Sequence, residues 1–434
     1  MRDPRLPATL RAYRIGLTLG EPAVAALLAW RARRGKEDPD RLRERRGHAG
    51  RPRPVGHVVW MHGASIGEVL SLLGIAEGMI ARKLRVLLTT GTRSAAELLA
   101  QRLPAGAVHQ YVPLDAPRWV ARFLDHWRPD LALIAESEIW PNTILALHER
   151  AIPCLVVNGR MSERSFAGWA RTPRTAAALF SRIGVYLVQT RDDAARFVAL
   201  GARHVRVIGN LKYDAAVPPA DMGQRDDLAG LIGDRPVWVA ASTHPGEDEA
   251  IAAAHASLKP RMPRLLTIVV PRHPRRGEAV AACCAAVGLR ASLRSKGGRP
   301  HGGVEVYVAD TLGELGLFYR LAPLVFLGGS LVEHGGQNPI EPTRLGSAVL
   351  HGPHVGNFTE PYRALDAAGG AAMVSDAHDL AAALGDLLAA PSRVAIMARQ
   401  GQAALTAFEG AVDRTLDVLD PYVAQMRLAA RTGA

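Results

Sequence analysis

From residue 55 onward, short apolar runs alternate with longer segments whose apolar residues recur at helical spacing. Apolar runs of about four to eight residues between turn signals are typical of buried strands, and strands that alternate with helices favour parallel sheets covered by helices. The strands predicted in the first half are 57–62, 85–90, 131–135, 154–158, 185–189 and 205–208. Those predicted in the second half are 236–241, 265–271, 305–309, 323–328 and 348–351. The sequence therefore predicts an α/β protein with doubly wound sheets.

The two halves of this pattern begin alike, at 58–79 and at 236–258, each with a strand, a loop of small residues and Gly-Glu at a helix start. A chain of 434 residues suits two domains of roughly 150–200 residues each. The Pro-rich stretch 215–223 has the composition of a linker. We expect a C-terminal helix near 411–430, which could pack across the domain boundary. The predicted division is a segment 1–50, a Rossmann-like domain 51–217 and a second Rossmann-like domain 218–434 that includes this helix.

The net charge of +12 and the sequence pI near 10.1 indicate an anionic partner, which could be nucleic acid, a phosphorylated substrate or an anionic membrane surface. Residues 31–53 contain ten Arg or Lys and four Asp or Glu, so they carry +6 of this charge. The same stretch has no aromatic residue, whereas a nucleic-acid-binding stripe would be expected to interleave aromatics with its cations.

An apolar run from Ile15 to Trp30 precedes the basic tract and contains Glu21 and Pro22. It is shorter than the roughly 20 apolar residues of a spanning helix, and no cleavage-site pattern follows it. An apolar segment followed by a basic tract is typical of a helix that lies in the surface of an anionic leaflet. We therefore expect a membrane-associating segment; the alternative is a helix packed on the protein's own core, followed by a solvated basic tail.

The three cysteines are Cys154, Cys283 and Cys284, and the last two are adjacent in the sequence. This is no disulfide framework and predicts a reducing compartment. No Cys and His residues have the spacing of a zinc site, so we expect no metal and no cofactor.

Candidate functional residues of the first half follow predicted strands, at the sheet edge where open α/β sheets bind ligands. Glu68 lies in HGASIGE (62–68), where it is either functional or an ordinary first-turn glutamate. Glu136 and Glu138 follow the strand 131–135, and two carboxylates there are costly unless exposed or partnered. Lys212 lies in GNLKYD (209–214), where it could reach a ligand or be solvated.

In the second half, PRHPRR (271–276) follows the strand 265–271, and Arg272 is its better phosphate candidate because a guanidinium makes paired contacts to phosphate oxygens. GGSLVEHGGQNPIEP (328–342) combines a Gly-rich loop, a helix start and Glu341, which could accept two ribose hydroxyls. Together these features favour nucleotide binding.

These motifs occur in a fixed order together with NGRMSERS (158–165), STHPGEDE (242–249) and ADTLGEL (309–315). In this order they resemble the bacterial 3-deoxy-D-manno-octulosonic acid (Kdo) transferases of lipopolysaccharide synthesis. The resemblance covers nearly the whole chain, and Gln337 stands where several relatives carry His.

The resemblance implies a GT-B fold, in which two Rossmann-like domains face each other across a cleft. It implies an inverting, metal-independent transfer of Kdo from CMP-Kdo to a 6-hydroxyl of the lipid A precursor, at the cytoplasmic face of the inner membrane. Glu68 matches the family's catalytic base, and Glu136 and Lys212 match positions that stabilise the transition state. The CMP-contacting positions are matched by Pro271, Arg272, Leu312, Gly313, Glu314, Asn338, Pro339, Ile340 and Glu341.

Three other functions are consistent with parts of the sequence. A related GT-B enzyme with a UDP-sugar donor would bind UDP better than CMP. A nucleic-acid-binding protein would need the aromatics that 31–53 lacks. A membrane adaptor without enzymatic activity would not need Glu68 or the Gly-rich loop.

Overall fold

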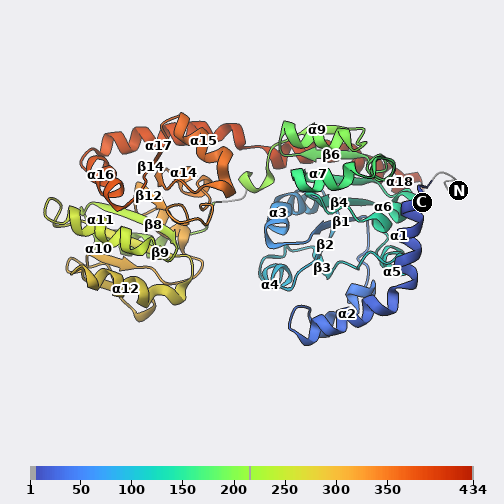
Figure 1. Ribbon diagram of the computed structural model, residues 1–434, viewed down its shortest axis with the longest axis horizontal. Coiled ribbons are helices and arrows are strands. Elements are labelled where there is room, and N and C mark those ends of the chain that lie inside the picture. The colour runs from blue at the N-terminus through green and yellow to red at the C-terminus, as the bar shows by residue number, and fades with distance from the viewer. Residues whose placement is uncertain (1–5, 215–216, 433–434) are drawn as a thin grey trace. The chain divides into compact units, whose positions relative to one another are not determined.

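The computed structural model describes residues 6–214 and 217–432, which form two compact units (Figure 1). Unit 1 contains residues 6–214 together with 409–432, and unit 2 contains residues 217–408. Each unit has one seven-stranded sheet in which all the paired strands run parallel. The expected α/β fold with doubly wound parallel sheets is confirmed.

The unit 1 sheet has the strand order β3-β2-β1-β4-β5-β6-β7. Its strands are β1 (Val58–Gly63), β2 (Arg85–Thr90), β3 (Ala107–Tyr111), β4 (Leu131–Ala135), β5 (Cys154–Gly159), β6 (Val185–Val188) and β7 (Val205–Val207). Its helices are α1 (Ala8–Leu19), α2 (Glu21–Arg33), α3 (Ile66–Ala81), α4 (Arg93–Arg102), α5 (Pro117–Trp127), α6 (Pro141–Glu149), α7 (Glu163–Ala170), α8 (Pro173–Phe180), α9 (Arg191–Ala199) and α18 (Ala411–Thr432).

Side-chain alternation along the strands of unit 1 builds a core on each face of the sheet. In β1, Val58 and Trp60 belong to a core with residues of α5, α6 and α8, whereas Val59 and Met61 belong to a core with residues of α3 and α18. Strands buried on both faces need apolar residues at every position, which explains the continuous apolar runs in the sequence.

The unit 2 sheet has the order β10-β11-β9-β8-β12-β13-β14. Its strands are β8 (Val237–Thr243), β9 (Leu266–Pro271), β10 (Ala291–Leu293), β11 (Val306–Val308), β12 (Leu324–Leu327), β13 (Ala348–His351) and β14 (Ala371–Met373). Its helices are α10 (Met222–Ile232), α11 (Asp248–Leu258), α12 (Gly277–Ala286), α13 (Leu315–Tyr319), α14 (Ile340–Arg344), α15 (Thr359–Ala367), α16 (Ala377–Leu388) and α17 (Pro391–Leu405). All eleven predicted strands are present; β3, β10 and β14 were not predicted.

The order of strands reverses between β1 and β4 in unit 1 and between β8 and β12 in unit 2. In open α/β sheets the connections leave to opposite sides at such a point, so that a crevice opens beyond the carboxyl ends of the two strands. The loops that follow β1, β4, β8 and β12 are therefore the places where each unit is built to hold a ligand.

The C-terminal helix α18 belongs to unit 1, which corrects the predicted domain 218–434. Asp214 holds its start, because its Oδ1 accepts from the Gly410 N–H at 2.8 Å and its Oδ2 accepts from the Val412 N–H at 2.6 Å. The apolar face of α18 then packs in the core beside α3, with Leu419 fully buried. The chain thus returns to unit 1 after unit 2 is complete.

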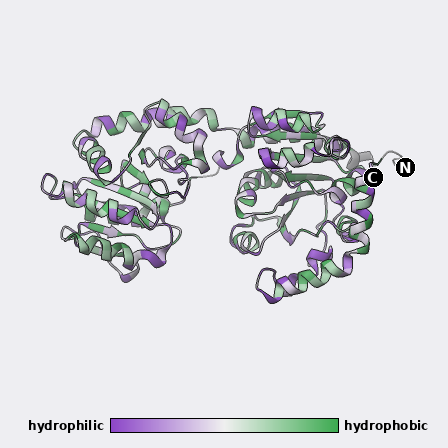
Figure 2. Cartoon of the chain, in the orientation of Figure 1, coloured by the Kyte–Doolittle hydropathy of each residue, from purple (hydrophilic) through white to green (hydrophobic). Residues whose placement is uncertain are grey.

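The amino-terminal helices each bury one leucine, Leu10 of α1 and Leu28 of α2. Among the apolar side chains that stay exposed on them are Ile15 (59%), Leu19 (77%), Leu27 (53%) and Trp30 (45%). Figure 2 accordingly shows apolar and polar colours alternating along α1 and α2. Within 6–214 and 217–432, no single helix has the length and apolar composition to cross a membrane; α16 and the chain from Pro391 to Leu428 reach that criterion as a pair bent by 104°.

Part of the basic tract 31–53 is folded onto unit 1. Arg45 is buried, donates to the Val112 carbonyl at 2.7 Å and pairs with Glu37. Arg41 makes two hydrogen bonds to the Glu44 carboxylate, and Arg53 donates to the Trp127 carbonyl. The tract is therefore a structural layer under β3 and α5 as well as a source of positive charge.

Candidate active site

Glu68 lies in the first turn of α3, shortly after the end of β1. Ser65 caps the helix, and its hydroxyl donates to Glu68 Oε1 at 2.6 Å. The Ala64 N–H donates to Glu68 Oε2 at 2.9 Å. Both carboxylate oxygens are thereby oriented by the small-residue loop, and the side chain is half-buried. A carboxylate held in this way can accept a proton from a hydroxyl within hydrogen-bond distance of it.

Glu136 and Lys212 form an ion pair at the same edge of the sheet. Lys212 Nζ lies 2.7 Å from Glu136 Oε1. Glu136 has a φ of 55°, so the chain turns sharply where β4 ends. A Cβ added at Gly67 would lie 3.5 Å from Lys212 Nζ, which places the lysine against the first turn of α3. The structure thus brings Glu68, Glu136 and Lys212 together.

Asn158 positions the segment that carries Lys212. It is buried at the end of β5, and its Oδ1 accepts from the Leu211 N–H at 3.0 Å. The conformation at Asn158 is left-handed, with φ of 53°, which asparagine tolerates better than most residues. Asn158 lies within the motif 158–165, although the sequence did not single it out as a site residue.

Glu138 adds a third carboxylate to this cluster. Its Oε2 accepts from Trp140 Nε1 at 2.9 Å and lies 4.0 Å from Nε2 of His62. Burial raises the pKa of Glu138, and the charges of Glu68 and Glu136 raise it further. His62 is buried and burial lowers its pKa to about 4, so its imidazole is neutral near pH 7. Unit 1 therefore presents a compact acidic site with one lysine.

Asp115 fixes the start of α6 and so the loop that carries Glu136 and Glu138. Its carboxylate accepts from the backbone N–H groups of Asn142 and Thr143 at 2.9 and 2.8 Å and from the Thr143 hydroxyl at 2.7 Å. Tyr13 of α1 also donates to it, at 3.1 Å. A network of hydrogen bonds therefore joins the amino-terminal helix to the acidic site.

We expect Asp115→Ala to lower the free energy of unfolding by about 2–4 kcal/mol, because it leaves several buried donors without an acceptor. Tyr13→Phe removes one donor and should cost about 0.5–1.5 kcal/mol. Urea unfolding of both variants beside wild type measures the difference. Equal losses for the two variants would contradict the role of the Asp115 carboxylate as the centre of this network.

Buried histidines predict how stability depends on pH. Burial lowers the pKa of His62 in unit 1 and of His255 in unit 2 to about 4, and the ordinary value is 6.5. Between pH 6.5 and 4 the unfolded chain binds more protons at these residues than the folded chain does. The free energy of unfolding should therefore fall as the pH falls through this window, by up to about 1.4 kcal/mol per pH unit for each proton.

Chemical denaturation at pH 7.5 and 5.0 measures this slope. The glutamine of His255→Gln can still form a hydrogen bond with the Thr267 hydroxyl, which lies 2.7 Å from Nδ1 of His255. Because glutamine does not titrate, the free energy of unfolding should depend less steeply on pH in this variant. An unchanged slope in this variant would contradict the assignment.

In unit 2, the predicted CMP-contacting residues lie on loops that follow β9, β11 and β12, which are close neighbours in the sheet. Pro271 ends β9, and the exposed Arg272 follows it. Among the described residues no carboxylate pairs with Arg272. Asn338 orders the start of α14: its Oδ1 accepts from the Ile340 N–H, and its Nδ2 donates to Glu341 Oε1 at 3.2 Å. Pro339 lies between them.

The loop after β11 holds Leu312, Gly313 and Glu314. Leu312 is 79% exposed, and Gly313 has a φ of 80° that a residue with a side chain would rarely adopt. Arg294 Nε donates to Glu314 Oε2 at 2.7 Å, and this hydrogen bond lowers the pKa of Glu314. Glu314 is therefore a partner of Arg294, which the sequence did not indicate.

His244 joins the β8 loop to the Gly-rich loop. Its ring lies 4.0 Å from that of His334, and its Nε2 lies 3.3 Å from Gln337 Nε2. Burial lowers the pKa of His244 to about 4, and the nearby Arg272 guanidinium adds to this shift. The segments around Arg272 and Gln337 thus meet at one neutral histidine.

Glu247, in the Gly-Glu at the helix start of the second half, is a residue of unit 2 that the sequence did not indicate as part of a site. It is fully buried, and its carboxylate accepts four backbone N–H groups. His244 and Gly329 donate to Oε2 at 2.9 and 2.7 Å, and Ser330 and Leu331 donate to Oε1, both at 3.0 Å. Glu247 therefore clamps the loops that follow β8 and β12 together at the point where the strand order reverses.

Comparisons with known proteins place this chain in a family. Residues 40–215 match the family described as 3-deoxy-D-manno-octulosonic-acid transferase (kdotransferase). The 3-deoxy-D-manno-octulosonic acid transferase of Haemophilus influenzae is 33% identical over 416 residues, which cover 94% of this chain and 97% of that protein. The transferase of the same name from Bordetella pertussis is 37% identical over 385 residues, covering 86% and 89%.

Solved structures agree on the fold. A glycosyltransferase from Rickettsia africae superimposes with a TM-score of 0.57 at 10% identity, over 85% of this chain and 99% of that one. A UDP-GlcNAc 2-epimerase from Neisseria meningitidis gives 0.55 at 15% identity, over 84% and 99%. Because these relatives are more than 30% identical to it along most of their length, this chain belongs to the 3-deoxy-D-manno-octulosonic acid transferase family and is a glycosyltransferase.

Proposed function

We propose that the protein transfers Kdo from CMP-Kdo to a 6-hydroxyl of a lipid A precursor, with inversion and without a metal ion. The observation that carries this proposal is the convergence of Glu68, Glu136 and Lys212 at the carboxyl edge of the unit 1 sheet. An acceptor hydroxyl needs a base as it attacks, and Glu68 is a carboxylate with both oxygens oriented. The names of the relatives support Kdo as the transferred sugar.

In this proposal Glu68 takes the proton of the acceptor hydroxyl while the hydroxyl oxygen bonds to the anomeric carbon of Kdo. The bond between that carbon and the phosphate oxygen of CMP breaks in the same step. Lys212, held by Glu136, offsets the negative charge of the carboxylates around Glu68. Arg272 and the 338–341 segment hold the nucleotide, so that the leaving phosphate is stabilised by a guanidinium.

The membrane attachment belongs to the same proposal. The exposed Ile15, Leu19, Leu27 and Trp30 would enter the interface of the cytoplasmic leaflet of the inner membrane, and the exposed cations of the tract 31–53 would meet its anionic lipids. This arrangement would keep the acceptor lipid and the acidic site of unit 1 at the same surface.

Thin-layer analysis tests the reaction: a radiolabelled tetra-acylated lipid A precursor is incubated with CMP-Kdo and the purified protein. We expect the lipid to shift, with the number of new spots reporting how many Kdo residues are added. CMP should inhibit the transfer better than UDP. A folded protein that shifts no lipid, or that UDP inhibits better, would reject the Kdo donor in favour of a UDP-sugar.

A further inference from the structure

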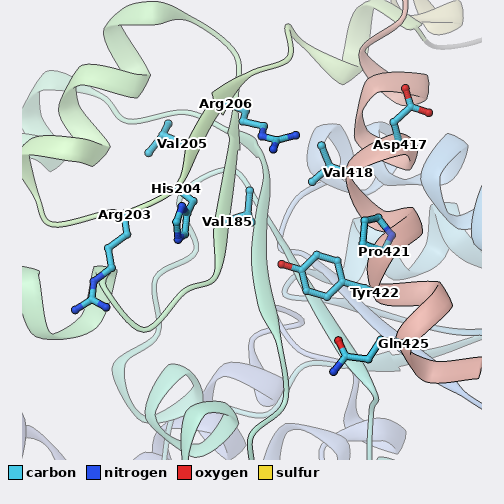
Figure 3. A pocket seen from close by; sticks show the side chains of 10 residues that line it. All are labelled: Val185, Arg203, His204, Val205, Arg206, Asp417, Val418, Pro421, Tyr422 and Gln425. Atoms are coloured by element: carbon cyan, nitrogen blue, oxygen red, sulfur yellow. The ribbon is translucent and has the colours of Figure 1, made fainter. Parts of the chain in front are cut away.

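A pocket of about 600 Å³ lies between α18 and the first residues of β6 and β7 (Figure 3). Val185 and Val205 begin these strands, whereas Glu68 and Glu136 follow the carboxyl ends of β1 and β4. Because all paired strands of this sheet are parallel, the pocket lies at the amino ends of the strands and the acidic site lies at their carboxyl ends. The volume is in the range of small-molecule sites, and the proposed transfer does not use it.

One wall of this pocket is basic. Arg203, His204 and Arg206 line it, and all three side chains are exposed. In the parts of the chain that the structure describes, none of the three pairs with a carboxylate. Figure 3 shows Arg206 reaching from β7 towards α18. Arginines that no carboxylate neutralises are suited to bind the oxygens of a phosphate group.

The opposite wall, formed by α18, supplies acceptors. Asp417 lies on it, and Pro421 is inside the helix four residues later. Proline has no N–H, so the carbonyl of Asp417 lacks its usual intrahelical donor. A carboxylate and a carbonyl from the same residue are then available for a ligand group that donates hydrogen bonds and carries positive charge.

The floor of the pocket is apolar, and the groove beside it is apolar in part. Val185, Val205 and Val418 line it, and an adjoining groove of about 280 Å³ shares Tyr422 and Gln425 with it. Ile152, Pro153 and Met426 line this groove, and so do His57 and Asp130, which lie 2.9 Å apart. A ligand with a charged head and an apolar tail would place its head in the pocket and its tail in the adjoining groove.

We propose that the pocket binds a phosphate ester that also carries an ammonium group, which is the chemistry of a phosphoethanolamine headgroup. Arg206 contacts the phosphate, and Asp417 with its freed carbonyl contacts the ammonium group. The same chemistry occurs in a membrane lipid and in soluble glycerophosphoethanolamine. The site is separate from both substrates of the proposed transfer.

Calorimetric titration of the full-length protein with glycerophosphoethanolamine tests the site. Arg206→Ala should weaken binding roughly ten- to hundredfold, because a charged hydrogen bond is lost. Arg102→Ala, which removes an exposed arginine of α4 outside the pocket, is the matched control and should bind like wild type. Equal affinities of the two variants, or no binding by folded wild type, overturn the proposal.

Two further ligands test the ammonium contact. Glycerol 3-phosphate lacks the ammonium group, and glycerophosphocholine has a quaternary nitrogen that cannot donate hydrogen bonds. Both should bind wild type more weakly than glycerophosphoethanolamine, and Asp417→Asn should reduce the difference. Equal binding of all three ligands to wild type overturns this half of the proposal.

Vesicles distinguish the two sources of the ligand. Sedimentation with phosphatidylethanolamine-containing vesicles is compared with phosphatidylcholine vesicles, for wild type, Arg206→Ala and Arg102→Ala. A gain from phosphatidylethanolamine that Arg206→Ala alone loses assigns the pocket to the lipid. Binding of the soluble ester without such a gain supports the site and assigns it to a soluble ligand. Transfer activity on a detergent-solubilised acceptor should be unchanged in Arg206→Ala, so that failure of this site and failure of the proposed function are distinguishable.

Discussion

Replacing Glu68 with glutamine is expected to lower the rate of Kdo transfer by about 100- to 10,000-fold, because a positioned general base typically contributes this much. The amide has nearly the shape of the carboxylate and can still accept from the Ser65 hydroxyl or the Ala64 N–H. It cannot take a proton from the acceptor hydroxyl. The loss should therefore appear in kcat, measured with saturating CMP-Kdo and acceptor, while nucleotide binding by unit 2 stays as in wild type.

The matched control is Glu77→Gln, an exposed position two to three turns further along the same helix, α3. This variant should transfer at the wild-type rate. If Glu68→Gln keeps full activity while Glu136→Gln loses it, the base is on the β4 loop instead. If both keep full activity, unit 1 supplies no carboxylate base and the proposed mechanism is wrong.

The largest effect on stability is expected in Glu247→Gln. The carboxylate accepts four buried N–H groups, and an amide in its place turns an NH₂ group towards some of them. Two donors left without an acceptor at about 1–3 kcal/mol each predict a loss of about 2–6 kcal/mol. CMP is expected to bind unit 2 and so to raise the temperature at which that unit unfolds, which identifies its calorimetric transition. Because Glu247 lies in unit 2, this transition should occur at a lower temperature in Glu247→Gln than in wild type.

CMP binding should weaken in the same variant at a temperature where it is still folded, since the loop from Gly329 to Leu331 loses its anchor. The matched control is Glu249→Gln, which changes an exposed glutamate in the first turn of α11, the helix that begins directly after Glu247. This variant should leave the temperature of the calorimetric transition unchanged. A wild-type unfolding temperature in Glu247→Gln would show that the four hydrogen bonds contribute little to stability.

The central strands could be predicted from the sequence because both of their faces are buried. β1, β4, β8 and β12 consist of residues that nearly all lie in a core, so each appears as an unbroken apolar run. β3, β10 and β14 lie at the outer edges of their sheets, where each strand is incompletely buried. Without burial on both sides the selection for an apolar run is weaker, and these three strands left no such signal, although the edge strand β7 was predicted.

For the site residues, what could be predicted depended on whether the partners lie close together in the sequence. Glu68, Glu136 and Lys212 follow predicted strands within motifs, and the structure brings them together. Glu247 has the sequence environment of an ordinary glutamate near the start of a helix. Its importance depends on three N–H groups that lie more than 80 residues away along the chain.

The sequence by itself determined the alternation of strands and helices, the two α/β units and the family, because these depend on local apolar pattern and on contiguous motifs. Tertiary structure alone decided that α18 returns to unit 1. Its apolar face would suit many cores, and the choice depends on Asp214, which accepts the first N–H groups of that helix from almost 200 residues away. It also decided which cations of the basic tract are held by hydrogen bonds to the rest of unit 1, because an acceptor such as the Val112 carbonyl for Arg45 is distant in sequence. Contacts between residues so far apart are set by packing, which no local pattern records.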